Sequence, residues 1–315
     1  MKGAMKKGLR YLISFFVIVT LNFALPRTMP GDPVMNMVGE DAHLTEATII
    51  SLRSELGLDR PLIVQYADYL WNLLHFDLGY SYHLYAPVAE VIYSRMFWTL
   101  LLVGVSIIIG AVIGTYAGAI AGWEPGKLKS RTMTFLAMSV SCTPPYFLAL
   151  IALYIFAFKL GIFPFKGYYA TLTTSSVIHH MILPVTVMSL FSASRNFMVM
   201  RGSVIQEKEQ LYALYARAKG LYHNQILFRH VFRNASLPII TQVALDFGFI
   251  VSGALFIEIV FSLNGLGTLI YDAILGRDYP VLQGAFLVIA FSVMLGNLAA
   301  DVLYSVVDPR IRRNI

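Results

Sequence analysis

The side chains that could do chemistry inside the apolar stretches of this chain are few and lie far apart in the sequence. Arg195, Asp246 and Asp301 fall within such stretches, and Glu258 lies near the end of one. A charge in hydrocarbon costs at least ~2.5 kcal/mol on insertion scales, so each position implies a polar partner or a polar path. Asn297 and Asp301 are four residues apart and share a helix face, which predicts a polar seam. Asp246, Glu258, Asn297 and Asp301 are therefore candidates for lining a path or for polar contacts within a bundle, and for Asp246 both roles stay open.

No pattern of a catalytic, cofactor or metal centre accompanies these residues. The string closest to a nucleotide-binding GxxxxGK[ST] loop, GWEPGKLKS at 122–130, has the wrong glycine spacing and a leucine after the lysine. Ser203 lies in MRGSVIQ, which lacks a GxSxG pattern. His179 and His180 are the only neighbouring histidines, and adjacent residues of a helix point to different sides. A single cysteine, Cys142, excludes a disulfide scaffold and a CxxC motif. The sequence predicts a protein that is not an enzyme and binds no cofactor or metal, and the isolated acids argue against a proton-coupled transporter.

The elements that must position these residues are apolar segments long enough to cross a bilayer. The chain has 315 residues, of which 57% are hydrophobic and 13% charged, and its mean hydropathy is +0.66. A soluble domain usually carries about 25% charged residues, whereas about 20 apolar residues suffice for one membrane span. We predict an all-α integral membrane protein with six transmembrane helices. The predicted spans are 11–26, 97–121, 132–158, 177–200, 238–260 and 281–307.

The basic residues predict the orientation of these helices. With the N-terminus in the cytoplasm, the inner segments hold 16 of the 24 lysines and arginines and the outer segments hold seven, while half of the 18 acidic residues lie in 27–96. The first apolar segment resembles a signal peptide, but no small-residue cleavage site follows it, so we predict a retained helix. The net charge of +6 is then a topology signal that requires no nucleic-acid partner, and both termini are predicted to be cytoplasmic.

Large loops divide the predicted chain into unequal parts. The long outer segment contains a helix that begins after Thr45, with Leu44 and Ile49 as a hydrophobic staple and Gly57 as its stop, and a second helix after Pro61. This segment could be a structural lid or a docking surface. The predicted parts are 1–26, a cytoplasmic tail with the first transmembrane helix; 27–96, an extracytoplasmic loop domain; 97–307, a five-helix core with the cytoplasmic loop 201–237; and 308–315, a cytoplasmic tail.

Glycines recur every four residues in the second span, at Gly110, Gly114, Gly118 and Gly122. This spacing places them on one stripe of a helix, where the missing side chains let another helix backbone approach closely. We predict tight helix packing along the stripe, with the lining of a moving translocation path as the alternative.

The loop 201–237 predicts a short helix that Gly220 ends, followed by a second helical pattern carrying Ile226, Leu227 and Val231. A short helix held across the mouth of a bundle is a rigid element that another protein could push. By itself, the same pattern also fits an amphipathic helix lying in the membrane interface.

The motifs of this loop resemble those of a known family. ARAKGL at 216–221, followed by RHVFRNASLP at 229–238, is similar to the coupling-loop signature of ATP-binding-cassette (ABC) permeases of the dipeptide/oligopeptide/nickel type. The resemblance extends over nearly the whole chain. Its further strings are PGDPV at 30–34, LGLDRPL at 56–62, DLGYS at 77–81, MRGS at 200–203, GLG at 265–267, RDYPVLQG at 277–284 and DPRIRR at 308–313.

The resemblance implies the type I importer fold and a permease subunit in the cell membrane of a prokaryote. Its partners would be a second homologous permease, two cytoplasmic ATP-binding subunits that carry ATP and Mg²⁺, an extracytoplasmic substrate-binding protein, and membrane lipid. Its cargo would be a di- to oligopeptide, with nickel or a metal chelate as the alternative. The residues that it implies for ATPase coupling are Tyr212, Tyr215, Ala216, Arg217, Ala218, Lys219, Gly220 and Leu221.

The sequence departs from the family pattern in two places. The family usually has an acidic residue followed by Tyr-Val-Arg-Thr before ARAKG, whereas this chain has LYALY at 211–215, with Glu207 and Glu209 supplying acidic charge earlier. A serine-proline-containing turn of the third span reads CTPPYF at 142–147. Because two successive prolines disrupt the helical hydrogen-bond ladder, the second departure predicts an altered kink.

Overall fold

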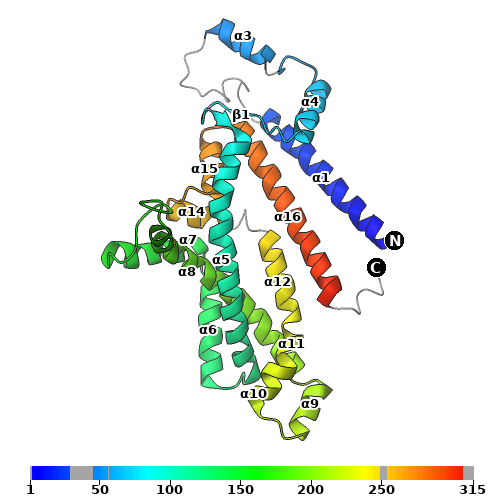
Figure 1. The fold of residues 1–315 in the computed structure, drawn as a ribbon, viewed down its shortest axis with the longest axis vertical. Coiled ribbons are helices and arrows are strands. Elements are labelled where there is room, and N and C mark those ends of the chain that lie inside the picture. Colours follow the sequence, from blue (N-terminus) through cyan, green and yellow to red (C-terminus); the bar gives the residue numbers. More distant parts are fainter. Residues whose placement is uncertain (1, 29–44, 56, 249–253, 308–315) are drawn as a thin grey trace. The chain divides into compact units, whose positions relative to one another are not determined.

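The computed structural model describes residues 2–28, 45–55, 57–248 and 254–307 (Figure 1). These residues are mostly helical, and β1 and β2 pair antiparallel as a two-residue hairpin. The elements are α1 (Lys2–Thr28), α3 (Glu46–Glu55), α4 (Leu62–Leu74), β1 (Tyr80–Ser81), β2 (Ala86–Pro87), α5 (Val88–Trp123), α6 (Leu128–Cys142), α7 (Pro145–Ala152), η1 (Leu153–Lys159), α8 (Thr174–Glu207), α9 (Leu211–Ala218), α10 (His223–Gln225), η2 (Ile226–Val231), α11 (Phe232–Ala235), α12 (Leu237–Gly248), α14 (Leu255–Val260), α15 (Leu266–Leu275) and α16 (Tyr279–Val307).

The described chain forms two compact units, and α5 and α16 each contribute to both. The first unit comprises the described residues up to Thr99 and Asn264–Met294. The second comprises the described residues of Leu100–Leu263 and those from Leu295 to the end of α16. The loop 201–237 and most of the glycine-bearing helix α5 therefore belong to the second unit.

Three described helices are long and apolar enough to span a membrane: α5, α8 and the part Tyr279–Ala299 of α16. They coincide with three of the predicted spans. A fourth candidate is a broken span, because α6 and the helical segment Pro145–Lys159 are bent by 103°. The structure thus replaces the single span predicted over 132–158 by two helical segments with a sharp break, at the prolines for which an altered kink is predicted. The break lies at Thr143 and Pro144, whose backbones are extended, with ψ values of 133° and 136°, and proline cannot donate to the helical ladder.

The remaining predicted spans correspond to shorter apolar helices. Leu9–Ala24 lies within α1. Of the predicted span 238–260, the structure describes α12 and the short α14, and the residues 249–253 between them lie outside the described part of the chain. At its 12 residues α12 is about 18 Å long, shorter than the ~30 Å hydrocarbon core. The apolar helix α15 follows a positive-φ turn at Ser262 and was not expected from the sequence.

In the first unit, side-chain hydrogen bonds join segments that are far apart in the sequence. Asn22 of α1 donates to the carbonyl of Gln283 at 2.7 Å, and the Gln283 side chain donates to the carbonyl of Asn22 at 3.0 Å. The Ser81 hydroxyl donates a short bond to the buried Asp278 carboxylate, which fixes the hairpin to the start of α16. The Thr99 hydroxyl accepts from the Leu266 amide at 2.8 Å and so satisfies a free donor at the start of α15.

The helices α3 and α4 begin and end close to where the sequence predicts. The Thr45 hydroxyl accepts from the amide of Thr48 at 3.3 Å, which confirms the predicted cap of α3. Gly57 has a φ of +63° after this helix, and the amide of Leu58 donates back to the Arg53 carbonyl at 2.9 Å. The second helix, α4, follows Pro61 as predicted. The predicted staple lies outside the described residues, which exclude Leu44 and the Ile49 side chain.

Candidate functional site

The implied coupling segment forms a separate short helix, α9, which follows α8 after a short turn (Figure 1). The Gly220 amide donates to the Arg217 carbonyl at 2.9 Å, and the Leu221 amide donates to the Ala216 carbonyl at 3.3 Å. These bonds satisfy carbonyls that α9 leaves open at its end. Gly220 adopts a φ of +79°, a left-handed conformation that costs glycine little. The chain turns sharply there and enters α10.

One face of α9 is anchored in an apolar cluster, and the other is open. Ala213 and Ala216 are buried, whereas Leu211 and Tyr215 are 70% and 68% exposed. The cluster also takes side chains from α5, α8, η2, α11 and α12, so a displacement of α9 acts on the ends of long helices. Its buried members are Ala119, Met200, Val204, Ala213, Ala216, Ile226, Leu227, Val231, Ala235 and Ile239.

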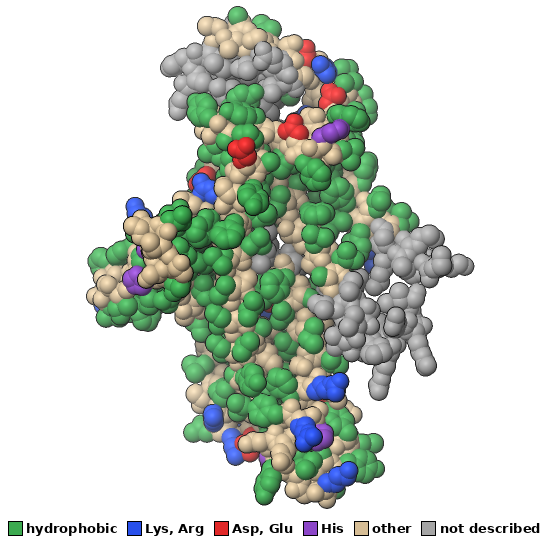
Figure 2. Space-filling view, in the orientation of Figure 1, with side chains coloured by type: hydrophobic (Ala, Val, Ile, Leu, Met, Phe, Trp, Pro, Cys, Tyr) green, Lys and Arg blue, Asp and Glu red, His purple; other side chains and the backbone are tan. Residues whose placement is uncertain are grey.

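The implied coupling residues divide between these two faces. Ala216 is buried and Tyr212 is half-buried. The Arg217 guanidinium lies 5.4 Å from the centre of the Trp123 ring, a cation–π distance that joins α9 to the end of α5. Figure 2 shows lysine and arginine side chains gathered at this end of the second unit. The exposed members of the set are Tyr215, Arg217, Ala218, Lys219, Gly220 and Leu221.

The surroundings of Tyr212 favour the protonated form of its hydroxyl. Burial, and then a hydrogen bond to the Glu207 carboxylate, raise the pKa of Tyr212 to about 12. The hydroxyl therefore stays protonated at neutral pH and donates to the carboxylate over 2.6 Å. The resemblance implies a coupling role for Tyr212, but no sequence pattern indicates that its side chain faces the apolar cluster.

The glycine stripe of α5 lies against α8. A Cβ atom built at Gly114 would lie 2.3 Å from the Ala193 carbonyl oxygen, and one at Gly110 would lie 2.4 Å from the Ser192 Cβ. Equivalent atoms at Gly118 and Gly122 would lie 2.6 and 2.7 Å from carbonyl oxygens of the same helix. Since real Cβ atoms do not approach so closely, the two backbones can keep this separation only because these residues are glycines.

Two of the isolated intramembrane charges form a pair. Nη1 of Arg195, on α8, lies 2.6 Å from Oδ1 of Asp246, on α12, and the Gln242 side chain donates to the same oxygen at 3.0 Å. No local spacing in the sequence relates these two residues, because 51 positions separate them along the chain. The pair borders a pocket of about 190 Å³ in the second unit.

Glu258 and Asn297 are not among the residues that line this pocket. Glu258 is fully buried on α14, whereas its neighbour Ile257 contributes to the pocket wall. Asn297 is half-buried on α16. The seam predicted for Asn297 and Asp301 cannot be traced, since the Asp301 side chain lies outside the described residues. Within the described parts of the chain, no three His, Cys, Asp or Glu side chains gather as a possible metal site.

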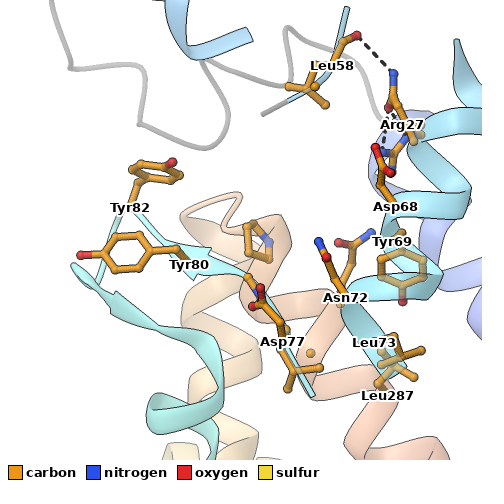
Figure 3. A pocket seen from close by; sticks show the side chains of 17 residues that line it. Arg27, Leu58, Asp68, Tyr69, Asn72, Leu73, Asp77, Tyr80, Tyr82 and Leu287 are labelled. Atoms are coloured by element: carbon orange, nitrogen blue, oxygen red, sulfur yellow. Dashed lines mark hydrogen bonds between the residues drawn. The ribbon is translucent and has the colours of Figure 1, made fainter. Parts of the chain in front are cut away.

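A second pocket, of about 230 Å³, lies in the first unit among α1, α4, the hairpin and α16 (Figure 3). Asp68, Asp77, Tyr80 and Tyr82 are among its lining residues. Arg27 also lines it, but the guanidinium is engaged: it donates to the Gln65 side chain at 2.9 and 3.2 Å and lies 3.6 Å from the centre of the Phe23 ring. Burial lowers the pKa of Arg27. No sequence pattern indicates this pocket, because its wall comes from segments distant along the chain.

Comparison with known proteins agrees with the motifs over nearly the whole sequence. Residues 110–313 match the family of binding-protein-dependent transport system inner membrane components, and residues 2–103 match the N-terminal family of the same components. The dipeptide transport system permease protein DppB of Escherichia coli K12 is 32% identical over 323 aligned positions that cover 95% of each chain. A Brucella abortus relative, provisionally named as a peptide transport system permease protein, is 34% identical over 94% of each chain. A Brucella ovis relative, provisionally named as a peptide permease protein, is 35% identical over 97% of this chain. The chain therefore belongs to the family of binding-protein-dependent inner-membrane components, the ABC transporter permeases that its coupling-loop motifs indicate.

Proposed function

We propose that this chain is a transmembrane subunit of an ATP-driven importer that moves di- to oligopeptides into the cytoplasm. It pairs with a second, homologous permease, and the transport path runs between the two. Two cytoplasmic subunits bind and hydrolyse ATP with Mg²⁺, and an extracytoplasmic binding protein delivers the cargo. The chain crosses the prokaryotic plasma membrane six times, with both termini and the loop 201–237 in the cytoplasm.

The observation that carries this proposal is the arrangement of α9. Its open face, with Leu211 and Tyr215, is apolar and aromatic and is displayed on a rigid short helix. Exposed aromatic and aliphatic side chains in such a patch favour protein contact. The opposite face packs into a cluster that includes side chains of α5, α8 and α12. A partner that moves α9 is therefore expected to move the ends of these helices with it. Closure of an ATPase dimer can in this way tilt the two bundles between outward-open and inward-open states.

Peptide cargo is supported by the names of the related permeases and by the chemistry of the second unit. The Escherichia coli relative is named for dipeptide transport. The pocket beside Arg195 combines apolar walls with few polar groups, which suits cargo of variable side chains better than a metal ion. A metal ion would need clustered imidazole, thiolate or carboxylate ligands.

Uptake by the reconstituted complex tests the proposal. The four membrane-associated subunits, placed in vesicles with the binding protein, are expected to accumulate labelled di- to oligopeptides only with ATP and Mg²⁺. Collapse of ion gradients leaves this uptake unchanged, and omission of the binding protein serves as the control. Uptake of nickel without competition from peptides would overturn the cargo assignment. Peptide uptake that needs an ion gradient and not ATP would overturn the mechanism.

A further inference from the structure

The guanidinium of Arg195 is held from one side and open on the other. Its Nη1 donates to Asp246, and no other hydrogen bond of this side chain is found among the described residues. The Arg195 side chain is 56% exposed and that of Asp246 is 10% exposed, so the acid is enclosed, while the guanidinium stays accessible beside the pocket that both residues line. A guanidinium has five N–H donors in a fixed plane, and the bond at Nη1 leaves the edge formed by Nε and Nη2 for a second acceptor.

The pair lies within predicted membrane-spanning helices. Asp246 is about 12 Å from the inner end of the span 238–260, given a rise of about 1.5 Å per residue. An ionisable residue at such a depth normally faces a bundle interior or a water-filled cavity, and it marks a substrate or ion pathway. The pocket beside the pair supplies that cavity. It is lined by side chains from α5, α7, α8, α12 and α14, all within the second unit.

The other hydrogen-bond donors around this pocket are neutral hydroxyls. The Ser106 hydroxyl already donates to the Leu102 carbonyl at 2.7 Å, whereas the Ser192 hydroxyl accepts from Asn196 at 3.3 Å and keeps its own proton as an uncharged donor. Much of the remaining wall is apolar, including Val103 and Phe191. The exposed edge of Arg195 is therefore the group of this pocket best placed to bind a carboxylate.

We infer that Arg195 binds the C-terminal carboxylate of a peptide in transit, and that Asp246 is the positioning residue that holds the guanidinium edge toward the pocket. This inference rests on the proposed function, which supplies the peptide. The carboxylate meets two parallel N–H donors, the geometry in which arginine binds carboxylates most strongly. Asp246 already balances the charge of Arg195. This weakens the contact between Arg195 and the peptide carboxylate, so the cargo can be released. Gln242, which donates to the same oxygen of Asp246, helps to keep that acid in place.

Photocrosslinking tests the site separately from transport. The probe is a diazirine-bearing tripeptide, prepared as the free acid and as the C-terminal amide. It is irradiated with the assembled complex in lipid nanodiscs without the binding protein, so that cargo selection by that component does not enter. The free acid is expected to label this chain about tenfold more than the amide, the size of one good charge-assisted contact. R195Q should abolish the difference, and R195K should retain part of it, because lysine keeps the charge and loses the paired donors.

Two further variants separate binding from folding. R60Q breaks an exposed arginine–aspartate pair, Arg60 with Asp68 at 3.1 Å, and should leave the preference for the acid unchanged. R195D/D246R keeps an ion pair between α8 and α12 but places the acid on the exposed side, so it should favour the amide.

The outcomes distinguish this inference from the proposed function. Equal labelling by acid and amide in the unmodified complex overturns the site, and so does a preference that R195Q leaves intact, even if ATP-driven peptide uptake is found. An Arg195-dependent preference in a complex that takes up no peptide supports the site and overturns the proposed function.

Discussion

The Tyr212 hydroxyl donates a 2.6 Å hydrogen bond to the carboxylate of Glu207, which ties the first turn of α9 to the last residue of α8. Between these residues the chain turns through Lys208–Gln210, where backbone hydrogen bonds keep the connection short. Together with the buried face of α9, this bond anchors α9 to the end of α8. In the proposed function, a force applied to α9 is expected to reach α8 through this contact.

Tyr212→Phe removes this bond and keeps the ring. Because Tyr212 is only half-buried, we expect a loss of about 1 kcal/mol in the stability of the subunit and a larger effect on coupling. ATP hydrolysis by the complex should continue while peptide uptake per ATP falls several-fold. Tyr215→Phe is the matched control for stability, since the exposed Tyr215 hydroxyl makes no hydrogen bond among the described residues. Equal coupling in Tyr212→Phe and the unmodified protein would contradict the role of the bond.

The same bond has a defined pH dependence. The pKa of Tyr212 is raised to about 12 in the folded protein, above the ordinary value of 10.0. Its contribution is therefore fully present below pH 10 and is lost as the pH rises through about 12. We expect the difference in unfolding free energy between the unmodified protein and Tyr212→Phe to be constant from pH 7 to about 9 and to shrink above about 10. Chemical denaturation in detergent at each pH measures it, and a difference that changes between pH 7 and 9 would contradict this assignment.

Gly220 permits a test of the turn that ends α9. Its φ of +79° strains any residue with a Cβ, while no atom lies within 4 Å of where that Cβ would be. A substitution thus lowers the stability only through backbone strain, by about 1–2 kcal/mol for an ordinary residue and by more for a β-branched one. Gly220→Val should impair uptake and ATPase stimulation while the protein still inserts, and Gly220→Asn should do less damage. Gly202→Ala, at a helical glycine with open space, is the control; normal transport by Gly220→Val would show that this turn is not the coupling turn.

Local features of this structure could be predicted from the sequence, because they depend on a few neighbouring residues. The hydroxyl of Thr45 caps α3 and Gly57 ends it, and both follow from what these side chains can do on their own. The helix patterns of α5, α8 and α16 coincide with three predicted spans for the same reason.

Features that depend on tertiary contact could not be predicted. The pairing of Arg195 with Asp246 joins α8 to α12 across 51 residues. The two prolines at 144–145 predict an altered kink, but no local rule gives the size of the bend, which is 103°. The inward position of Tyr212 also depends on the cluster beneath α9, which draws on five other elements. Helical periodicity and turn motifs describe only neighbouring residues, so they contain no information about these long-range contacts.

The glycine stripe of α5 predicts a graded response to added methyl groups. Gly114→Ala places a Cβ 2.3 Å from a backbone carbonyl oxygen of α8, an atom that cannot rotate away, so the helices must separate. Overpacking of this kind costs about 1–3 kcal/mol. Thermal unfolding of the detergent-solubilised subunit should show a lowered midpoint for Gly114→Ala. Gly126→Ala, where nothing lies within 4 Å, should leave the midpoint unchanged, and equal midpoints for the two variants would contradict the close contact.

The membrane orientation can be tested at two exposed aromatic residues, Tyr85 in the hairpin and Tyr222 after the coupling turn, which are 83% and 78% exposed. The asymmetry of lysine and arginine places the first outside and the second in the cytoplasm. The only native cysteine, Cys142, is exposed and is first replaced by serine. In intact cells a membrane-impermeant maleimide should then label Tyr85→Cys and spare Tyr222→Cys, and permeabilised cells should show labelling of both. Labelling of both variants in intact cells, or of Tyr222→Cys alone, would overturn the proposed six-span orientation, because an odd number of crossings must separate the two positions.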